Sequence, residues 1–212
     1  MRGSNGQWNG LEISMAKASS NLKMEVKHAV DVLKRGGVVI FPTETSYGIS
    51  CDATNVKAVR RVFAIKGRPE GKGTPLIVDS FLMAKKWGVF NLMASVLAKH
   101  YWPGALTIVV PAKGKVAGMV LQDKTVALRV SSNETARALA KGLGRPVVAT
   151  SANLAGEPPS YSLRAMKRLL NQKIASDVYV LNVGALPRRK PTTLVKTTDD
   201  AFVILRQGAI KL

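Results

Sequence analysis

The chain has 212 residues, and 46% of them are hydrophobic, which is enough to bury the core of one domain and excludes a disordered or collagen-like protein. Its 32 Lys and Arg residues outnumber 13 Asp and Glu residues, which gives a net charge of +19. Such an excess favours a polyanionic partner, such as a nucleic acid or a nucleotide, over simple adaptation to a salty or acidic cytoplasm.

Cysteine and hydropathy patterns indicate the compartment. A single cysteine, Cys51, excludes a disulfide within the chain, and with only two histidines a Cys- or His-based metal centre is not expected. No apolar run approaches the roughly 20 residues that cross a bilayer, and the N-terminus has no apolar signal segment. We therefore predict a cytoplasmic protein with no membrane partner and no metal ligands of its own.

The first predicted element is a polar N-terminal tail over residues 1–22, followed by one continuous domain over 23–212. From Met24 onward, apolar residues recur at helical spacing, and Gly36 and Gly37 occupy the positions of a helix C-cap. A second helix is predicted over 55–66, with Asn55 as its N-cap. Two later helices are predicted over residues 132–144 and 161–172.

Strands alternate with these helices along the chain. The predicted strands are rich in β-branched residues and cover residues 38–41, 75–78, 105–110, 125–130, 146–150, 178–181, 192–196 and 202–206. Intermixed strands and helices indicate an α/β fold, which we expect to be a single domain with one twisted, mostly buried sheet flanked by helices.

A loop rich in glycine and cations, residues 66–73, follows the second helix. Its sequence "KGRPEGKG" is one residue short of a Walker phosphate loop, and Gly73 replaces the Ser or Thr that would bind magnesium. The glycines still permit backbone N–H groups to face an anion, while Arg68 can bind two phosphate oxygens and Lys66 can add a point charge. A solvated basic loop is the alternative.

Two hydroxyl-rich loops follow predicted strands. Thr43 and Thr45 share one face if the backbone is extended, with Glu44 pointing away, and Ser151 and Asn153 share a face in the same way. Each pair is also compatible with a simple turn at a strand end. Because ligands of α/β sheets gather outside strand ends, we expect these loops to converge.

Arg129 lies inside an apolar strand, where an unpaired cation is costly to bury, so it either extends to solvent or meets an anion. No Ser/His/Asp set and no close pair of carboxylates is legible in the candidate loops. A site of cations and hydroxyls suits phosphate chemistry by positioning and charge stabilisation, with Mg²⁺ held by the phosphates of a nucleotide.

Six segments, in this order, resemble the YrdC family, which contains the threonylcarbamoyl-AMP synthases, over about residues 24–210. They are "FPTETSYGI", "KGRP" with "TPLIV", "WPGALTIV", "ALRV", "ATSANLAGEPPS" and "PTTLV" with "ILRQGAI". The resemblance implies a twisted α/β sheet with a basic concave face. It also implies ATP-dependent synthesis of L-threonylcarbamoyl-AMP from L-threonine and bicarbonate, a nucleotidyltransferase reaction with Mg²⁺ accompanying ATP.

The same resemblance implies a place in tRNA processing, at position 37, with tRNA and a threonylcarbamoyl-transfer complex as partners. It assigns roles to individual residues. The catalytic residues would be Lys66, Arg68, Ser151 and Asn153; the ATP-binding residues Lys66, Arg68, Thr107, Asn153 and Arg206; and the threonine-binding residues Thr43, Thr45, Arg129, Ser151 and Thr193, with Thr192 in the same closing segment.

Three departures from the family pattern are visible. Ser131 stands where many members have proline, Thr74 replaces a lysine although Lys72 is near, and the chain ends at Leu212, so we expect no Sua-type C-terminal domain. Two other functions stay open. One is a non-catalytic module of the YrdC/YciO type that binds tRNA or double-stranded RNA, and the other is a carbamoyl-adenylate enzyme of the hydrogenase-maturation type.

Overall fold

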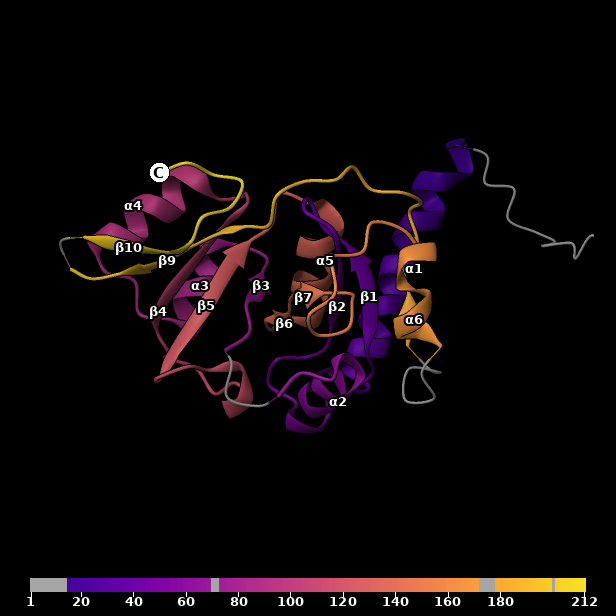
Figure 1. Cartoon of the computed structure of the whole chain (residues 1–212), viewed down its shortest axis with the longest axis horizontal. Helices are drawn as coiled ribbons and strands as arrows, with labels where there is room; N and C mark the ends of the chain where they lie inside the picture. The colour runs from indigo at the N-terminus through magenta and orange to yellow at the C-terminus, as the bar shows by residue number, and fades with distance from the viewer. Residues whose placement is uncertain (1–14, 70–72, 172–177, 200) are drawn as a thin grey trace, which may run out of the picture.

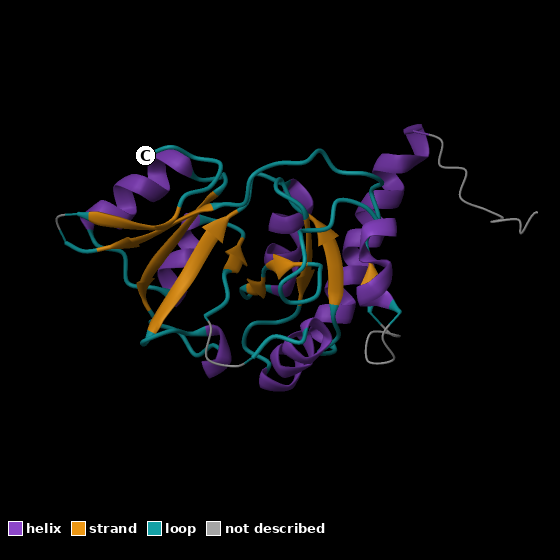
Figure 2. Cartoon of the chain, in the orientation of Figure 1, coloured by secondary structure: helices purple, strands orange, loops and turns teal. Residues whose placement is uncertain are grey.

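The structure is a computed structural model that describes residues 15–69, 73–171, 178–199 and 201–212, with the side chains from residue 21 onward. Most of the predicted tail, Lys72 and the last residue of the predicted helix over 161–172 lie outside the described residues. Within the described residues, ten strands form two sheets, and helices pack around these sheets in one α/β body (Figures 1 and 2).

The first helix, α1 (Met15–Lys34), begins inside the segment predicted as a tail, so the prediction of a helix start near Met24 was wrong. Its C-terminal end agrees with the prediction. The Gly36 N–H donates to the Leu33 carbonyl at 2.9 Å, and the Gly37 N–H donates to the Val32 carbonyl at 2.9 Å. Gly36 has φ of 78°, a conformation that glycine adopts without strain.

The smaller sheet has the strand order β7-β2-β1-β8. Its strands are β1 (Val39–Pro42), β2 (Tyr47–Ser50), β7 (Thr150–Ser151) and β8 (Tyr179–Val180). β1 and β2 form an antiparallel hairpin in which Pro42 pairs with Tyr47. The turn of this hairpin, residues 43–46, therefore lies at one end of the sheet.

The larger sheet has the order β10-β9-β4-β5-β3-β6. Its strands are β3 (Leu76–Val78), β4 (Leu106–Pro111), β5 (Thr125–Val130), β6 (Val147–Val148), β9 (Thr193–Thr197) and β10 (Phe202–Arg206). The α/β class is confirmed, but the strands divide between two sheets and not one. The strand predicted over 146–150 splits at Ala149, so that β6 joins the larger sheet and β7 the smaller one.

The helices flank both sheets, and the helix over residues 134–143 packs between the sheets, against β1 and β3 (Figure 2). They are α2 (Val56–Lys66), α3 (Phe81–Trp87), α4 (Leu92–Tyr101), α5 (Glu134–Leu143) and α6 (Lys167–Leu170), with short 3-10 turns η1 (Gly118–Val120) and η2 (Arg164–Met166). The sequence analysis predicted α2 and α5 but missed α3 and α4. It overextended the helix over 161–172, which in the described residues is η2 followed by α6.

The two sheets share one hydrophobic core. Alternate residues of β1 face opposite sides: Ile40 packs in a cluster with Leu76 and Leu128 of the larger sheet, and Phe41 packs in a second cluster with Leu33 of α1 and Leu139 of α5. Because both faces of β1 are buried, its apolar run has no polar alternation. The shared core fixes the ends of the two sheets relative to each other.

Candidate active site between the two sheets

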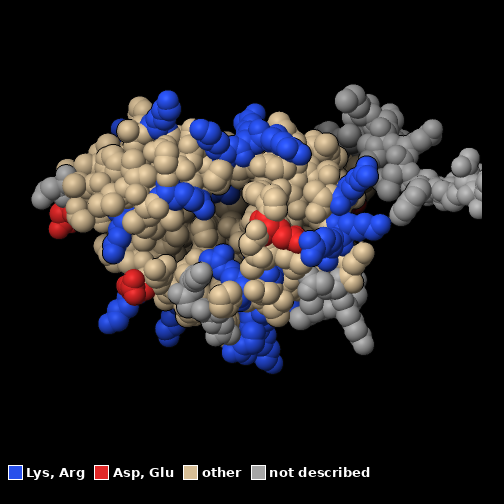
Figure 3. All heavy atoms as spheres, viewed as in Figure 1, with Lys and Arg blue, Asp and Glu red and all other residues tan. Residues whose placement is uncertain are grey.

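A cavity of about 490 Å³ lies where the two sheets face each other. The smaller sheet and its turn contribute Thr43, Thr45, Ser46, Gly48, Thr150 and Ser151; the larger sheet contributes Thr107, Arg129, Leu194 and Arg206; connecting loops contribute Arg68, Gly73, Pro75, Ala149, Pro159, Tyr161, Arg189, Pro191 and Thr192. No Asp or Glu is present among these lining residues. In Figure 3 this face is hollowed at its centre, with Lys and Arg side chains around the hollow.

Lys66 joins the two segments on which the predicted site depends. Its ammonium group donates to the carbonyl oxygen of Ser151 and, at 2.8 Å, to that of Asn153. Lys66 is only 4% exposed. Burial, together with the nearby Arg68 guanidinium, lowers the pKa of Lys66 to about 8. The predicted convergence of the Lys66 loop with the Ser151–Asn153 loop is thus confirmed. The ammonium group of Lys66 holds the two loops together.

The end of α2 explains why two cations two residues apart take different positions. Asn55 caps the start of the helix, with its Oδ1 accepting from the Ala58 N–H at 3.1 Å. At the other end, Gly67 has φ of 59° and reverses the chain direction. Lys66 therefore stays buried beside the helix, while Arg68 turns into the cavity and donates from Nη2 to the Gly73 carbonyl at 2.8 Å.

A smaller cavity of about 270 Å³ adjoins the first and shares Arg68, Thr150 and Ser151 with it. Asn153 lines this smaller cavity and is 7% exposed. Its Nδ2 donates to the carbonyls of Leu154 at 2.9 Å and Glu157 at 2.6 Å, whereas its Oδ1 has no hydrogen-bond donor in the part of the chain that is described. A donor from a bound ligand would satisfy this acceptor.

The backbone at Ser151 and Asn153 is turned and not extended, because the Asn153 N–H donates to the Ser151 carbonyl at 2.9 Å. Thr43 and Thr45 also differ from the prediction. The Thr43 hydroxyl donates to the Ser46 carbonyl at 2.7 Å and lies 3.1 Å from the Thr45 hydroxyl. The two threonines meet through a tight turn, and both line the cavity.

Arg129 meets an anion of the chain itself and does not extend to solvent. Its Nη1 donates to Glu44 Oε1 at 2.6 Å, and both side chains are at least nine-tenths buried. The Ser131 hydroxyl donates to the other oxygen of Glu44. Burial lowers the pKa of Arg129, the Glu44 carboxylate opposes that shift, and the nearby Arg206 adds to it. Glu44 was expected to point away; it points across to the larger sheet.

The third group of predicted residues lies on β4, on β10 and just before β9. The Thr107 hydroxyl donates to the Thr192 hydroxyl at 3.0 Å, and Arg206 donates from Nη2 to the Thr192 carbonyl at 3.0 Å and hydroxyl at 2.9 Å. Burial lowers the pKa of Arg206. All three residues line the cavity.

Thr193 is the exception among the predicted threonine-binding residues, because it does not line the cavity. Its hydroxyl donates to the Ile210 carbonyl at 2.6 Å and accepts from the N–H groups of Gly208 and Ile210, each at 3.1 Å. Thr193 therefore positions the C-terminal segment, and its neighbour Thr192 presents the hydroxyl to the cavity. Alternation of side chains along β9 is the reason.

Several residues of this region were not predicted as site residues. Among them are Glu44 and Ser131, which hold Arg129, and Tyr161 and Arg189, which line the cavity. The only signal for Arg189 was a run of three cations, residues 188–190, which on its own reads as a solvated surface segment.

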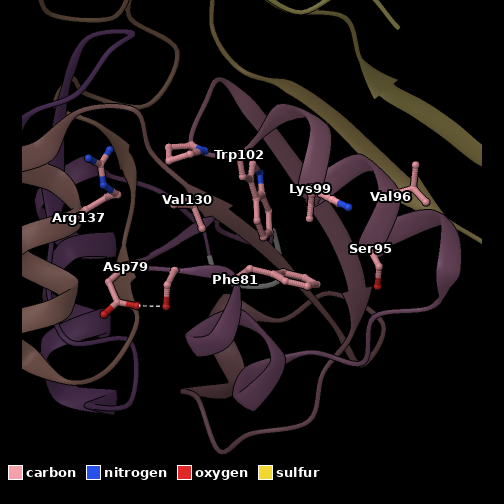
Figure 4. Close-up of a pocket in the computed structure, with 11 residues that line it drawn as sticks. Asp79, Phe81, Ser95, Val96, Lys99, Trp102, Val130 and Arg137 are labelled. Carbon is pink, nitrogen blue, oxygen red and sulfur yellow. Dashed lines mark hydrogen bonds between the residues drawn. The ribbon is translucent and has the colours of Figure 1, made fainter.

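A separate cavity of about 570 Å³ lies away from this site, between α3, α4, α5 and the end of β5. Figure 4 shows its aromatic side chains, Phe81 and Trp102, with Arg137 and Lys99 on opposite sides. The Trp102 indole N–H donates to the Leu106 carbonyl at 2.7 Å, so the partly buried ring is anchored against the core. None of the predicted site residues lines this cavity.

The described residues contain no cluster of three or more His, Cys, Asp or Glu side chains that could hold a metal ion, and no helix long and apolar enough to cross a membrane.

Known proteins with similar sequences and structures indicate the family of this chain. The family model Sua5/YciO/YrdC, described as "Telomere recombination", matches residues 31–208. A relative named threonylcarbamoyl-AMP synthase, from Thiobacillus denitrificans, is 35% identical over 165 residues, which are 77% of this chain and 86% of the relative.

Solved structures agree. P. abyssi Sua5 complexed with L-threonine superposes with a TM-score of 0.77 at 30% identity, covering 86% of this chain and 54% of that chain, so this chain spans about half of that protein. E. coli YciO superposes with a TM-score of 0.76 at 29% identity, covering 88% of this chain and 90% of that chain. The chain therefore belongs to the Sua5/YciO/YrdC family.

Proposed function

We propose that this protein forms L-threonylcarbamoyl-AMP from L-threonine, bicarbonate and ATP, with release of pyrophosphate, and is thus a nucleotidyltransferase. The observation that carries the proposal is the junction of Lys66 and Arg68 with Ser151 and Asn153 at one cavity. The relative named for this activity and the threonine complex of Sua5 support the choice of substrates.

In the proposed reaction, the amino group of threonine and bicarbonate condense to a carbamate with loss of water. A carbamate oxygen then attacks the α-phosphorus of ATP. The new O–P bond forms while the bond from that phosphorus to the bridging oxygen breaks, and the electron pair leaves with pyrophosphate. Arg68 offsets the charge that develops on the phosphoryl oxygens, and the Ser151 hydroxyl donates to the same group.

Threonine is assigned to the side of the cavity that holds Thr43, Thr45 and Arg129. Glu44 occupies Nη1 of Arg129, so the remaining N–H groups of this arginine are those that we assign to the threonine carboxylate. Thr107, Thr192 and Arg206 line the same cavity, and we assign them to the nucleotide.

Mg²⁺ is proposed to enter with ATP and to be held largely by its phosphates, as is usual for this ion. Asn153 Oδ1, the buried acceptor that no described residue satisfies, is the protein oxygen that we assign to a water of its hydration shell.

The product is a reactive mixed anhydride, and we propose that it serves threonylcarbamoylation of tRNA at position 37 in the cytoplasm, through a transfer complex. The test is a pyrophosphate-release assay in which threonine, bicarbonate, ATP and Mg²⁺ are omitted one at a time. Turnover that requires all four is expected. Pyrophosphate release without threonine would exclude this function.

The net charge of +19 also favours the second candidate, a non-catalytic module that binds tRNA or double-stranded RNA. Such a module would bind RNA with an affinity that falls steeply with salt, by a slope of about −0.9 per phosphate neutralised on a duplex. RNA binding that persists in a Lys66/Arg68/Ser151/Asn153 quadruple alanine variant, without pyrophosphate release by the wild type, would select it.

A further inference from the structure

A strap of irregular chain, residues 182–192, connects β8 of the smaller sheet to β9 of the larger one (Figure 1). Its backbone is tied at several points. The Tyr47 phenol accepts from the Val183 N–H at 3.0 Å and donates to the Gly184 carbonyl at 2.7 Å. Long irregular segments held in this way inside a compact domain usually serve a site.

The middle of the strap rests on Tyr161. The Leu186 N–H donates to the Tyr161 carbonyl at 2.8 Å, and the Tyr161 hydroxyl donates to the Arg189 carbonyl at 3.2 Å. At its end, the Pro191 carbonyl accepts from the Ala209 N–H at 2.9 Å. The backbone on both sides of Arg189 is therefore held, which leaves its side chain as the part that can adjust.

Two adjacent arginines of the strap have different surroundings. The guanidinium of Arg188 lies over the Tyr161 ring, 5.9 Å from the ring centroid, and Arg188 does not line the cavity. Arg189 lines the cavity together with Arg68, Arg129 and Arg206. Arg188 is therefore a natural control for Arg189, because it has the same charge on the same strap but lies outside the cavity.

The other three arginines of the cavity are held by the chain: Arg68 by the Gly73 carbonyl, Arg129 by Glu44, and Arg206 by Thr192. Arg189 is exposed, and its guanidinium has no hydrogen-bond or ion-pair partner among the described residues. It is therefore the lining cation whose N–H groups are free to follow a ligand.

The charge balance of the cavity points to an anionic ligand for this group. Glu44 offsets the charge of Arg129, which leaves Arg68 and Arg206 as the fixed cations that face the substrates. A triphosphate brings more negative oxygens than two guanidiniums can pair, and a planar guanidinium binds two phosphate oxygens at once.

We infer that Arg189 is a further substrate-binding residue, which binds the phosphate chain of ATP from the strap. This inference rests on the proposed function and deepens it. It adds an exposed contact of the cavity lining to the buried junction of Lys66 with Ser151 and Asn153.

The test compares Arg189→Gln with Arg188→Gln, which removes the same charge one residue away. Binding of ATP with Mg²⁺ is measured by titration calorimetry without threonine or bicarbonate. Loss of a charge-assisted hydrogen bond predicts about tenfold weaker binding for Arg189→Gln, and binding within about twofold of wild type for Arg188→Gln. Arg189→Lys should fall between, because lysine keeps the charge but not the planar fork.

Steady-state kinetics supply a second readout. The KM for ATP should rise about tenfold in Arg189→Gln, with the KM for threonine unchanged and with a melting temperature equal to that of wild type. Equal ATP affinity in Arg189→Gln and wild type overturns the inference, as do equal losses in the two variants or a rise in the KM for threonine alone. Wild-type protein that binds no ATP overturns the proposed function as well, so the two failures are distinguishable.

Discussion

Two cavities of similar size have opposite linings in this molecule. The cavity between the sheets, about 490 Å³, is lined by hydroxyls and arginines from segments far apart in the chain. The cavity beside α3 and α4, about 570 Å³, is lined mainly by apolar and aromatic side chains, with Lys99 and Arg137 on opposite sides (Figure 4). Volume alone would favour the second.

The difference lies in how the polar groups are held. At the first cavity, Arg68, Arg129 and Arg206 donate to fixed oxygens of the chain, as does Lys66 beside it, so a ligand meets an arranged set of charges. In the second, Phe81 and Trp102 pack against Phe90, with ring centroids 6.3 Å apart or closer, and fill space as core residues do. Because fixed polar groups stabilise developing charge, the first cavity is the better candidate for an active site although it is the smaller of the two.

Ser131 lies at the boundary between these regions. Its hydroxyl donates to Glu44 beside the first cavity, while its carbonyl accepts from Arg137 Nη1, at the edge of the second, at 2.6 Å. Ser131 is thus part of the support of Arg129. If the arranged polar groups carry the chemistry, substitutions at the two cavities should differ in their effects on activity and stability.

The largest expected effect is on stability. Glu44→Gln removes the negative charge beside buried Arg129 and should lower the free energy of unfolding by about 3 kcal/mol. The measurement is urea unfolding at pH 7. Glu157→Gln is the matched control, because its partner Arg168 is 79% exposed, and it should cost less than about 1 kcal/mol. Equal losses in the two variants would contradict a special role for the buried pair.

The next effect is on turnover. Arg68→Ala should lower kcat for pyrophosphate release by about a hundredfold, since it removes charge stabilisation at the reacting phosphate. Lys99→Ala, which removes an exposed cation of the second cavity, should leave kcat within about twofold. If both substitutions had equal effects, the assignment of chemistry to the first cavity would be wrong.

A pH dependence should follow from Lys66. Its pKa of about 8 means that the ammonium loses its charge above that pH, so activity should fall about tenfold per pH unit beyond pH 8. Lys66→Arg, if active, should shift this limb upward. A limb that stays in place in the variant would assign the titration to another group.

The same shift predicts a stability trend of defined sign. The folded pKa of Lys66 lies below its ordinary value of 10.5, so between about pH 8 and 10.5 the unfolded state binds more protons than the folded state. The contribution of Lys66 to stability should therefore rise with pH across that window. Unfolding of wild type and Lys66→Met, compared at pH 8 and pH 10, measures the difference.

The smallest effect is expected in the second cavity. Phe81→Leu keeps an apolar side chain but removes the edge contacts with Phe90 and Trp102, which should cost about 1 kcal/mol of stability. Pyrophosphate release should remain within about twofold of wild type. A large loss of activity with normal stability would show that this cavity takes part in function.

Local signals in the sequence predicted much of the secondary structure. The caps of α2, Asn55 and Gly67, act within a few residues, so its extent was predictable, and so were the adjacent positions of Lys66 and Arg68. The β-branched runs predicted most strands for the same reason. α3 and α4 were missed although Ser80 and Asn91 cap them. α3 has only 7 residues, and the apolar residues of α4 are not confined to one face, so neither shows a clear helical period.

Side-chain direction within the site was less predictable. Thr193 faces the C-terminal segment, and Thr43 closes a turn on Ser46, because hydrogen bonds of the surrounding chain set these orientations. The division of residues 146–150 between two sheets was also invisible, since strand pairing depends on neighbours that are distant in sequence.

The sequence by itself determined the class of fold, the family and the kinds of group at the site, because periodicity, caps and ordered motifs are properties of short segments. Only the tertiary structure decided that Arg129 pairs with Glu44, 85 residues away, and that Arg189 lines the cavity while Arg188 rests on Tyr161. Those outcomes follow from how two sheets are brought together around one core, and no local pattern encodes that arrangement.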